Sequence, residues 1–123
     1  MNINTVILVG RAGRHPEIKY YESGKTMAHF SLAVDRRRQS PDEEAETDWF
    51  KIELWGRQAE IAHEYIKKGS LVGVKGRIEF KNRPHPTGNL TQPSEVPVIR
   101  CYHLRLLGGK RDIVPPSGQD PLF

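Results

Sequence analysis

The stretch DWFKIELWGRQAEIAHEYIKKG, residues 48–69, decides the fold of this 123-residue chain. Phe50, Ile52 and Leu54 alternate with polar and aromatic residues, which is the period of a β-strand with one buried face. After the glycine that follows this strand, apolar residues recur at helical spacing until two lysines and a second glycine form a stop signal. We therefore expect a strand that leads directly into a helix at residues 57–68, the one convincing helix of the sequence.

Strands account for most of the sequence around this stretch. Alternating apolar and polar residues, bounded by turn formers, predict five further strands at residues 3–9, 18–21, 28–35, 71–81 and 96–107. A single helix excludes a parallel α/β fold, which needs helices between most strands. The order of elements favours an all-β OB-fold, a five-stranded Greek-key barrel with one helix between the third and fourth barrel strands. We expect this domain to span residues 1–108, and residues 109–123 to form a short, flexible and disordered C-terminal tail.

Length, hydropathy and cysteine content exclude several classes of protein. A chain of 123 residues has room for one domain of ordinary size. No segment approaches the roughly 20 apolar residues of a membrane-spanning helix, and the N-terminus does not resemble a secretory signal. The single cysteine, Cys101, has no partner for an internal disulfide, which fits a reducing cytoplasm.

The polar residues do not form a recognisable catalytic or metal-binding pattern. The five histidines stand apart without metal-ligand spacing, and Cys101 lies within an apolar strand, where a buried and inert thiol is typical. No phosphate-binding GxxxxGK[ST] motif occurs, and the acidic loop at residues 42–46 is more typical of a solvated surface than of a Mg²⁺ site. We expect no enzymatic activity, no cofactor and no metal.

Charge is segregated along the chain, although the net charge is only +4. Residues 1–41 carry a net charge of +4, residues 42–66 a net charge of −6 and residues 67–111 a net charge of +8. Two basic segments on either side of an acidic one predict a surface with a positive face. That pattern fits both a binding site for a polyanion and ordinary solvated charge.

Two tryptophans lie on the outer face of the strand expected at residues 48–55. Because three apolar residues already complete its buried face, Trp49 and Trp55 point away from the core, with Lys51 between them. Aromatic rings interleaved with a cation predict a stacking platform for nucleobases, since each base stacked on an aromatic ring gives about 1–3 kcal/mol with little sequence preference. The alternative is that the tryptophans pack against another subunit or a covering loop.

Basic side chains on neighbouring segments extend this candidate platform. Some follow the third strand as a mobile basic finger, and others share the outer face of the strand at residues 71–81 or follow its end: Arg36, Arg37, Arg38, Lys75, Arg77, Lys81 and Arg83. Such cations would contact phosphates and release counterions. Phe80 has the parity of the buried face, which favours a core role over contact with nucleic acid. Because the two roles are close in weight, Phe80 is also a candidate contact.

Eight motifs in order resemble the bacterial single-stranded DNA-binding protein (SSB) family. They are VILVGR at residues 6–11, PE at 16–17, SGK at 23–25, FSLAVDR at 30–36, DWF at 48–50, LWGRQAE at 54–60, KKGSLV at 67–72 and VKGRI at 74–78. The resemblance covers about residues 1–108. It implies an OB-fold that assembles as a homotetramer, wraps single-stranded DNA without sequence preference in DNA replication, recombination and repair, and lies with the nucleoid in the cytoplasm.

The resemblance also assigns roles to residues. Trp49 and Trp55 stand where the family places base-stacking aromatics, and Arg38 and Arg83 stand where many members carry tryptophan. Arginine still stacks on bases and contacts phosphates, so the resemblance implies a larger electrostatic share of the binding energy. Arg11, at the end of the first motif, completes the candidate contacts with single-stranded DNA.

The C-terminal tail is shorter than the family pattern. Family members usually carry a long linker rich in glycine, proline and glutamine, and an acidic tip ending in Pro-Phe that docks replication and repair proteins. Here the linker is only about a dozen residues long, and the chain ends Asp120, Pro121, Leu122, Phe123. The resemblance implies a reduced partner-docking tip.

Two other functions remain compatible with the sequence. An SSB-like adaptor of the primosome or competence machinery would act mainly through protein contacts. The short tail favours that function, whereas the strand that carries Trp49 and Trp55 opposes it. An RNA-binding OB module is a further alternative, because no residue pattern here recognises a 2′-hydroxyl group.

Overall fold

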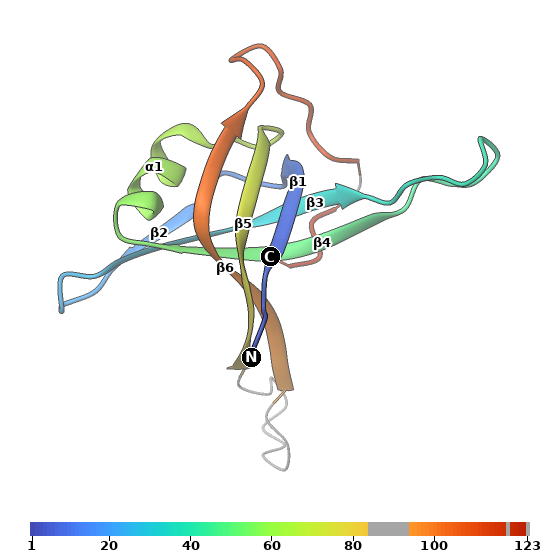
Figure 1. Cartoon of the computed structure of the whole chain (residues 1–123). Coiled ribbons are helices and arrows are strands. Elements are labelled where there is room, and N and C mark those ends of the chain that lie inside the picture. The colour runs from blue at the N-terminus through green and yellow to red at the C-terminus, as the bar shows by residue number, and fades with distance from the viewer. Residues whose placement is uncertain (84–93, 118, 123) are drawn as a thin grey trace.

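In the part of the chain that the structure describes, six strands and one helix follow one another in the order that the sequence predicts. The computed structural model describes residues 1–83, 94–117 and 119–122, and Figure 1 shows its arrangement. The elements are β1 (Val6–Ala12), β2 (Glu17–Tyr20), β3 (Thr26–Asp35), β4 (Thr47–Trp55), α1 (Arg57–Tyr65), β5 (Leu71–Arg83) and β6 (Ser94–Leu107). No helix within these described ranges is long and apolar enough to cross a membrane.

The sheet closes on itself through two short pairings. Its strand order is β1-β5-β6-β4-β3-β2, and β1 also pairs with β3 at Arg11↔Ala33 and Ala12↔Leu32. On the other side β4 and β6 run parallel, with Ile52 opposite Ile99. The closed set is β1, β3, β4, β5 and β6, with α1 between the third and fourth of these strands. This arrangement confirms the expected five-stranded OB-fold.

The core fills the inside of this barrel and continues under α1. Phe30, Ile52 and Leu54 are fully buried, as the alternation of β3 and β4 predicts. Ala59 and Ala62 of α1 are also fully buried against this cluster. A buried phenylalanine of this kind stabilises the fold by about 3–5 kcal/mol relative to alanine, so β3 and β4 are rigid supports for the side chains on their outer faces.

The helix is shorter than the periodicity predicts. It ends at Tyr65 rather than at residue 68, because Ile66 has an extended backbone (φ −83°, ψ 131°) and is fully buried. The Ile66 N–H still donates to the Ala62 carbonyl and closes the last turn. Lys67 and Lys68 therefore lie beyond the helix, and the predicted helix stop was wrong by one turn.

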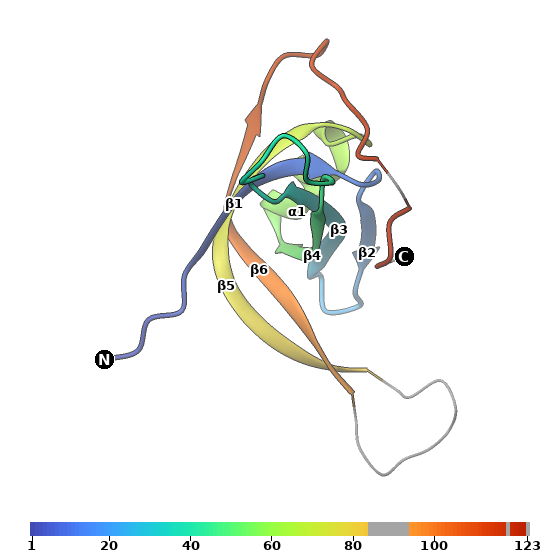
Figure 2. The ribbon, with the colours of Figure 1, turned by 90° about the vertical axis from the view of Figure 1, so that its right-hand side faces the viewer.

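Phe80 corrects the expected extent of the core. The parity of β5 places it with buried Val72 and Val74, yet its side chain is 65% exposed. The paired ends of β5 and β6 curve away from the barrel, as Figure 2 shows. Among the described residues, the core cluster includes Val72 and Val74 of β5 but not Phe80. The predicted core role of Phe80 was wrong, and the side chain is free to contact a ligand.

The C-terminal tail differs from the expected disordered segment. After β6 it turns back along the barrel (Figure 2), where Ile113 forms a β-bridge with Ser70 and the Val114 N–H donates to the Gly69 carbonyl at 3.0 Å. Farther on, the Ser31 hydroxyl donates to the Asp120 carboxylate. Backbone and side-chain hydrogen bonds thus hold the tail against the domain.

Candidate nucleic-acid interface

The two tryptophans occupy the outer face of β4, at its two ends. Each is partly buried, whereas Ile52 and Leu54 on the opposite face are fully buried. Trp49 pairs across the sheet with Ala33, and Trp55 pairs with Met27. Strand alternation therefore places both indole rings as the sequence predicts, on a rigid central strand of the barrel.

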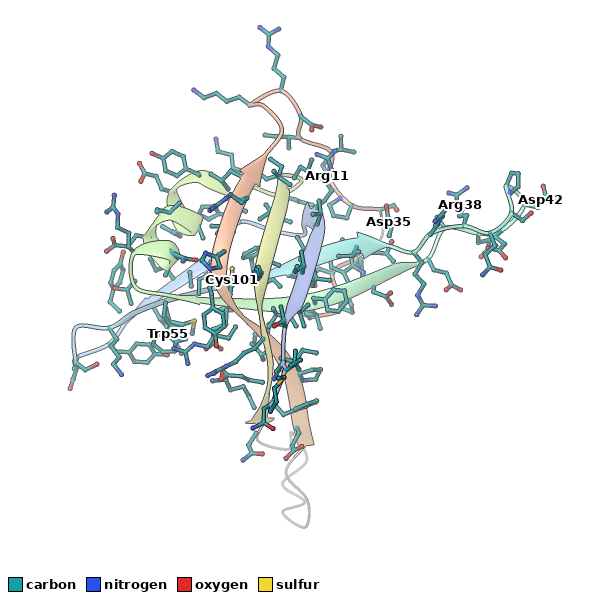
Figure 3. The ribbon with its side chains drawn as sticks, viewed as in Figure 1. Arg11, Asp35, Arg38, Asp42, Trp55 and Cys101 are labelled. Carbon is teal, nitrogen blue, oxygen red and sulfur yellow. The ribbon has the colours of Figure 1, made fainter. Side chains whose placement is uncertain are left out.

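Trp55 is held by three neighbours. The Tyr21 ring stacks on it with a centroid distance of 5.8 Å and an interplanar angle of 20°, and the Arg100 guanidinium lies 5.7 Å from its ring centroid. Its Nε1–H donates to Glu53 at 2.7 Å. Figure 3 shows Trp55 near the β2–β3 hairpin, far from Arg38 at the other end of the molecule. The indole is therefore preorganised in an aromatic and cationic environment.

The β5 cations converge on this same end of β4. Lys81 lies 3.6 Å from the Glu53 carboxylate that also binds Trp55. Arg77 pairs with Glu79 at 2.7 Å and lies over the Tyr102 ring, and its hydrogen bond to Glu79 raises the pKa of the guanidinium. Two of the predicted phosphate contacts are thus brought near Trp55, while Lys75 is exposed farther along the strand.

Trp49 lies beside the C-terminal tail. A Cβ built on Gly13 would stand 2.5 Å from Trp49 Cζ3, 2.5 Å from Ser31 Oγ and 3.1 Å from Asp120 Oδ2. Because Gly13 has no side chain, the Trp49 indole, the Ser31 hydroxyl and the Asp120 carboxylate can all pack around it. A base that stacked on Trp49 would lie close to this carboxylate, which repels phosphate.

The arginines after β3 lie among acids of the same hairpin, and Arg36 forms ion pairs with two of them. We call residues 36–46, which project from the β3–β4 hairpin in Figure 1, the finger. Arg36 donates to Asp48 at 3.0 Å and to Glu46 at 2.6 Å. These hydrogen bonds hold the pKa of the Asp48 carboxyl below its usual value. Arg37 and Arg38 are exposed and share a hollow of about 480 Å³ with Arg36 and three glutamates.

Three further predicted contacts lie elsewhere. Arg11 binds the tail, since its guanidinium donates to the Asp112 carbonyl and contacts the Asp112 carboxylate, both at 3.1 Å. Lys51 is partly buried at the centre of β4, between the two tryptophans. The side chain of Arg83 and the whole of Phe123 lie outside the described residues.

Two members of the Trp55 environment have no clear signal in the sequence. Tyr21 belongs to a turn, and Arg100 reaches Trp55 because β4 and β6 pair in parallel, with Glu53 opposite Arg100. That pairing joins segments far apart in the chain. In the sequence, the only sign of this role for Tyr21 is that an aromatic residue stands beside a turn.

Groups suited to covalent or metal chemistry are not assembled in the described part of the chain. Within it, no three His, Cys, Asp or Glu side chains stand close enough to hold a metal ion. Burial raises the pKa of the Cys101 thiol to about 11. The thiol is therefore protonated at neutral pH and a poor nucleophile.

Comparison with known proteins agrees with this geometry. The Single-strand binding protein family matches residues 3–104. Single-stranded DNA-binding protein 1 of Synechocystis sp. is 50% identical over 112 residues, 91% of this chain and 89% of that protein. The single-stranded DNA-binding protein of Thermosynechococcus vestitus is 37% identical over 124 residues, 98% of each chain.

A solved structure has the same fold. Plasmodium falciparum SSB in complex with ssDNA superposes with a TM-score of 0.74 and 28% sequence identity, covering 88% of this chain and 97% of that chain. The barrel, the outward tryptophans and these matches lead to one conclusion. The chain belongs to the Single-strand binding protein family.

Proposed function

We propose that this protein binds single-stranded DNA without sequence preference and protects it during DNA replication, recombination and repair. The observation that carries the proposal is the outward Trp55 ring, held between Tyr21 and Arg100 and bordered by the β5 cations. Stacking on such a ring gives about 1–3 kcal/mol per base, and every base has a face that can stack. The chain acts by binding alone, without catalysing a reaction.

Phosphate contacts supply the other part of the affinity. The proposed contacts are Lys51, Lys75, Arg77, Lys81, Arg83, Arg11 and Arg36 to Arg38, with Phe80, Trp49 and Trp55 as stacking residues. At about 0.7 per neutralised phosphate, six such contacts give a log–log salt slope of roughly −4. Single strands are favoured over duplex DNA, because stacked and paired bases do not expose their faces.

The edge of β1 supports assembly into a homo-oligomer, which we propose is a tetramer. Among the described residues, Val6 to Val9 pair with β5 on one side only, since the β1–β3 pairing is limited to Arg11 and Ala12 and Gly10 already packs against Ala33. Ile7 and Val9 on this strand are 69% and 53% exposed. An open edge with exposed apolar side chains is a template for a second chain. Native mass spectrometry of the free protein tests this assembly.

Residues 1–108 form the proposed DNA-binding domain, and residues 109–123 the proposed tail. The tip from Asp120 to Leu122, with Phe123, is a reduced docking site for replication and repair proteins, available once Asp120 leaves Ser31. Binding to chromosomal single strands places the protein with the nucleoid in the cytoplasm.

Intrinsic tryptophan fluorescence tests the function directly. The protein is titrated with oligo(dT) and with duplex DNA of equal charge, at low and high salt. We expect strong quenching by oligo(dT) that persists at moderate salt and is absent with duplex. No quenching with either ligand contradicts DNA binding and favours the adaptor function, and equal competition by an RNA oligomer favours an RNA-binding module.

A further inference from the structure

A cleft of about 490 Å³ opens beside Trp55, at the end of β4 opposite the finger. Its walls come from the turn between β2 and β3 and from the first residues of α1. The side chains that line it include Lys25, Trp55, Arg57, Glu60 and Arg100. We call it the Trp55 cleft. None of its three cations is among the candidate DNA contacts predicted from the sequence.

The charge of the Trp55 cleft favours a phosphate. Three cations and one carboxylate line it, whereas the hollow at the finger contains three arginines and three glutamates. Lys25 and Arg57 are exposed, and the ion pair of Arg100 with Glu79 is long, at 4.0 Å. These cations are therefore able to turn toward an anion without breaking a short salt bridge.

The walls of the Trp55 cleft leave room for a backbone to approach. Gly24 and Gly56 line it with φ angles of +87° and +66°, and a Cβ built on either would meet nothing within 4 Å. Positive φ angles are strained for other residues, so glycine keeps both walls free of side chains. The strand of a ligand can pass over them in close contact.

The indole of Trp55 provides the floor. The lining of the Trp55 cleft includes Arg100 but not Tyr21, so a base would reach the ring from the side of Arg100. The Arg100 guanidinium carbon lies 5.7 Å from the centroid of the Trp55 ring. Because the Arg100 side chain is partly exposed, it is able to move aside and cover a base that stacks on the indole.

We propose that the Trp55 cleft holds one nucleotide of the bound strand, its base between Trp55 and Arg100 and its phosphate between Lys25 and Arg57. This inference rests on the proposed function and extends it. It adds Lys25, Arg57 and Arg100 to the contacts and directs the strand across the end of β4 toward α1.

The test compares two double variants that each remove one lysine and one arginine. Lys25→Ala/Arg57→Ala changes the cleft, and Lys110→Ala/Arg111→Ala removes exposed cations from the tail. Both are made in a Trp49→Phe background, so that Trp55 alone reports on oligo(dT). We expect the cleft variant to weaken binding about tenfold at moderate salt and to reduce the salt slope by about 0.7, the share of one phosphate, with the tail variant within about twofold of the background.

Arg100 gives an independent readout. Arg100→Lys keeps the charge but not the planar stacking group, so we expect it to change the quenching of Trp55 more than the salt slope. Equal losses in the cleft and tail variants, with unaltered Trp55 quenching, would overturn the proposal while leaving DNA binding intact. Failure of the Trp49→Phe background and the unmodified protein to bind oligo(dT) would instead overturn the proposed function. Circular dichroism and native mass confirm that each variant folds.

Discussion

The two ends of β4 carry the same residue on the same face, yet they offer a DNA strand opposite surroundings. Trp55 stacks on Tyr21, lies under Arg100 and borders a cleft with more cations than acids. Trp49 lies beside the Asp120 carboxylate and next to a finger whose arginines are balanced by glutamates. Strand parity decides which residues face outward, but partners from distant segments decide whether an outward aromatic ring attracts a phosphate chain.

The largest expected effect separates the two tryptophans. We expect Trp55→Ala to weaken binding to oligo(dT) about 10- to 100-fold, because it removes a stacking surface worth about 1–3 kcal/mol in a cationic site. Trp49→Ala should cost about threefold or less, since the tail carboxylate already disfavours phosphate there. Fluorescence anisotropy of labelled oligo(dT) measures both affinities. Equal losses, or a larger loss for Trp49→Ala, would contradict the contrast between the ends.

Local patterns were enough to predict the fold and the positions of both tryptophans. The alternation of β4 and the helix after it depend on residues that are neighbours in sequence. The order of strands and helix along the chain, and the outward orientation of both indole rings, could therefore be predicted from local patterns. The end of α1 at Tyr65 and the exposure of Phe80 depend instead on where the barrel stops covering a segment. Periodicity within one segment contains no information about that boundary.

The surroundings of the tryptophans were less predictable for the same reason. Arg100 reaches Trp55 through the parallel β4–β6 pairing, and Asp120 reaches Ser31 through a tail that the sequence presents as a disordered segment. Each contact joins residues that are distant in the chain. The prediction of a mobile basic finger also did not include ion pairs within its own hairpin, where Glu46 and Asp48 bind Arg36.

The finger offers the second test, through its acids. Glu43→Gln/Glu44→Gln/Glu46→Gln leaves three arginines without most of their counter-charges. We expect oligo(dT) to bind about three- to tenfold more tightly at low salt, because additional phosphates are neutralised, with the gain disappearing near 0.5 M salt. Anisotropy titrations over a range of salt concentrations measure both effects. Unchanged low-salt affinity would mean that the finger lies off the path of the strand.

A smaller effect is expected from the tail. Asp120→Ala removes the carboxylate beside Trp49, and Ser31→Ala removes its hydrogen-bond donor without changing the charge. A hydrogen bond to a charged group contributes about 1.5–3 kcal/mol, of which we expect only a part to oppose DNA binding, so release of the tail should tighten binding about threefold. In a Trp55→Phe background, Trp49 quenching by oligo(dT) should increase in both variants. An increase in Asp120→Ala alone would assign the effect to charge, and no increase in either would mean that the tail does not restrict Trp49.

The smallest effect is a pH response confined to the Trp55 end. His29 lies opposite Glu53 in the sheet and 3.3 Å from Glu17. Burial, followed by the charge of Lys51, lowers the pKa of His29 from its ordinary value of 6.5, although Glu17 and Glu53 act in the opposite direction. The unfolded chain therefore binds the proton more readily than the folded one. The stability from neutral His29 is fully present above pH 6.5 and decreases as the pH falls below it.

We accordingly expect the thermal midpoint to fall between pH 7.5 and 5.5, and to fall less in His29→Gln. At the other end, Arg36 holds the pKa of Asp48 below its usual value, so that carboxylate stays ionised throughout this range. Asp48→Asn should therefore leave the pH dependence unchanged, which makes it the matched control. Calorimetry at the two pH values measures all three proteins. The same fall in His29→Gln and the unmodified protein would show that the two ends of β4 do not differ in their response to protons, and the contrast between them would then rest on their charges and stacking partners alone.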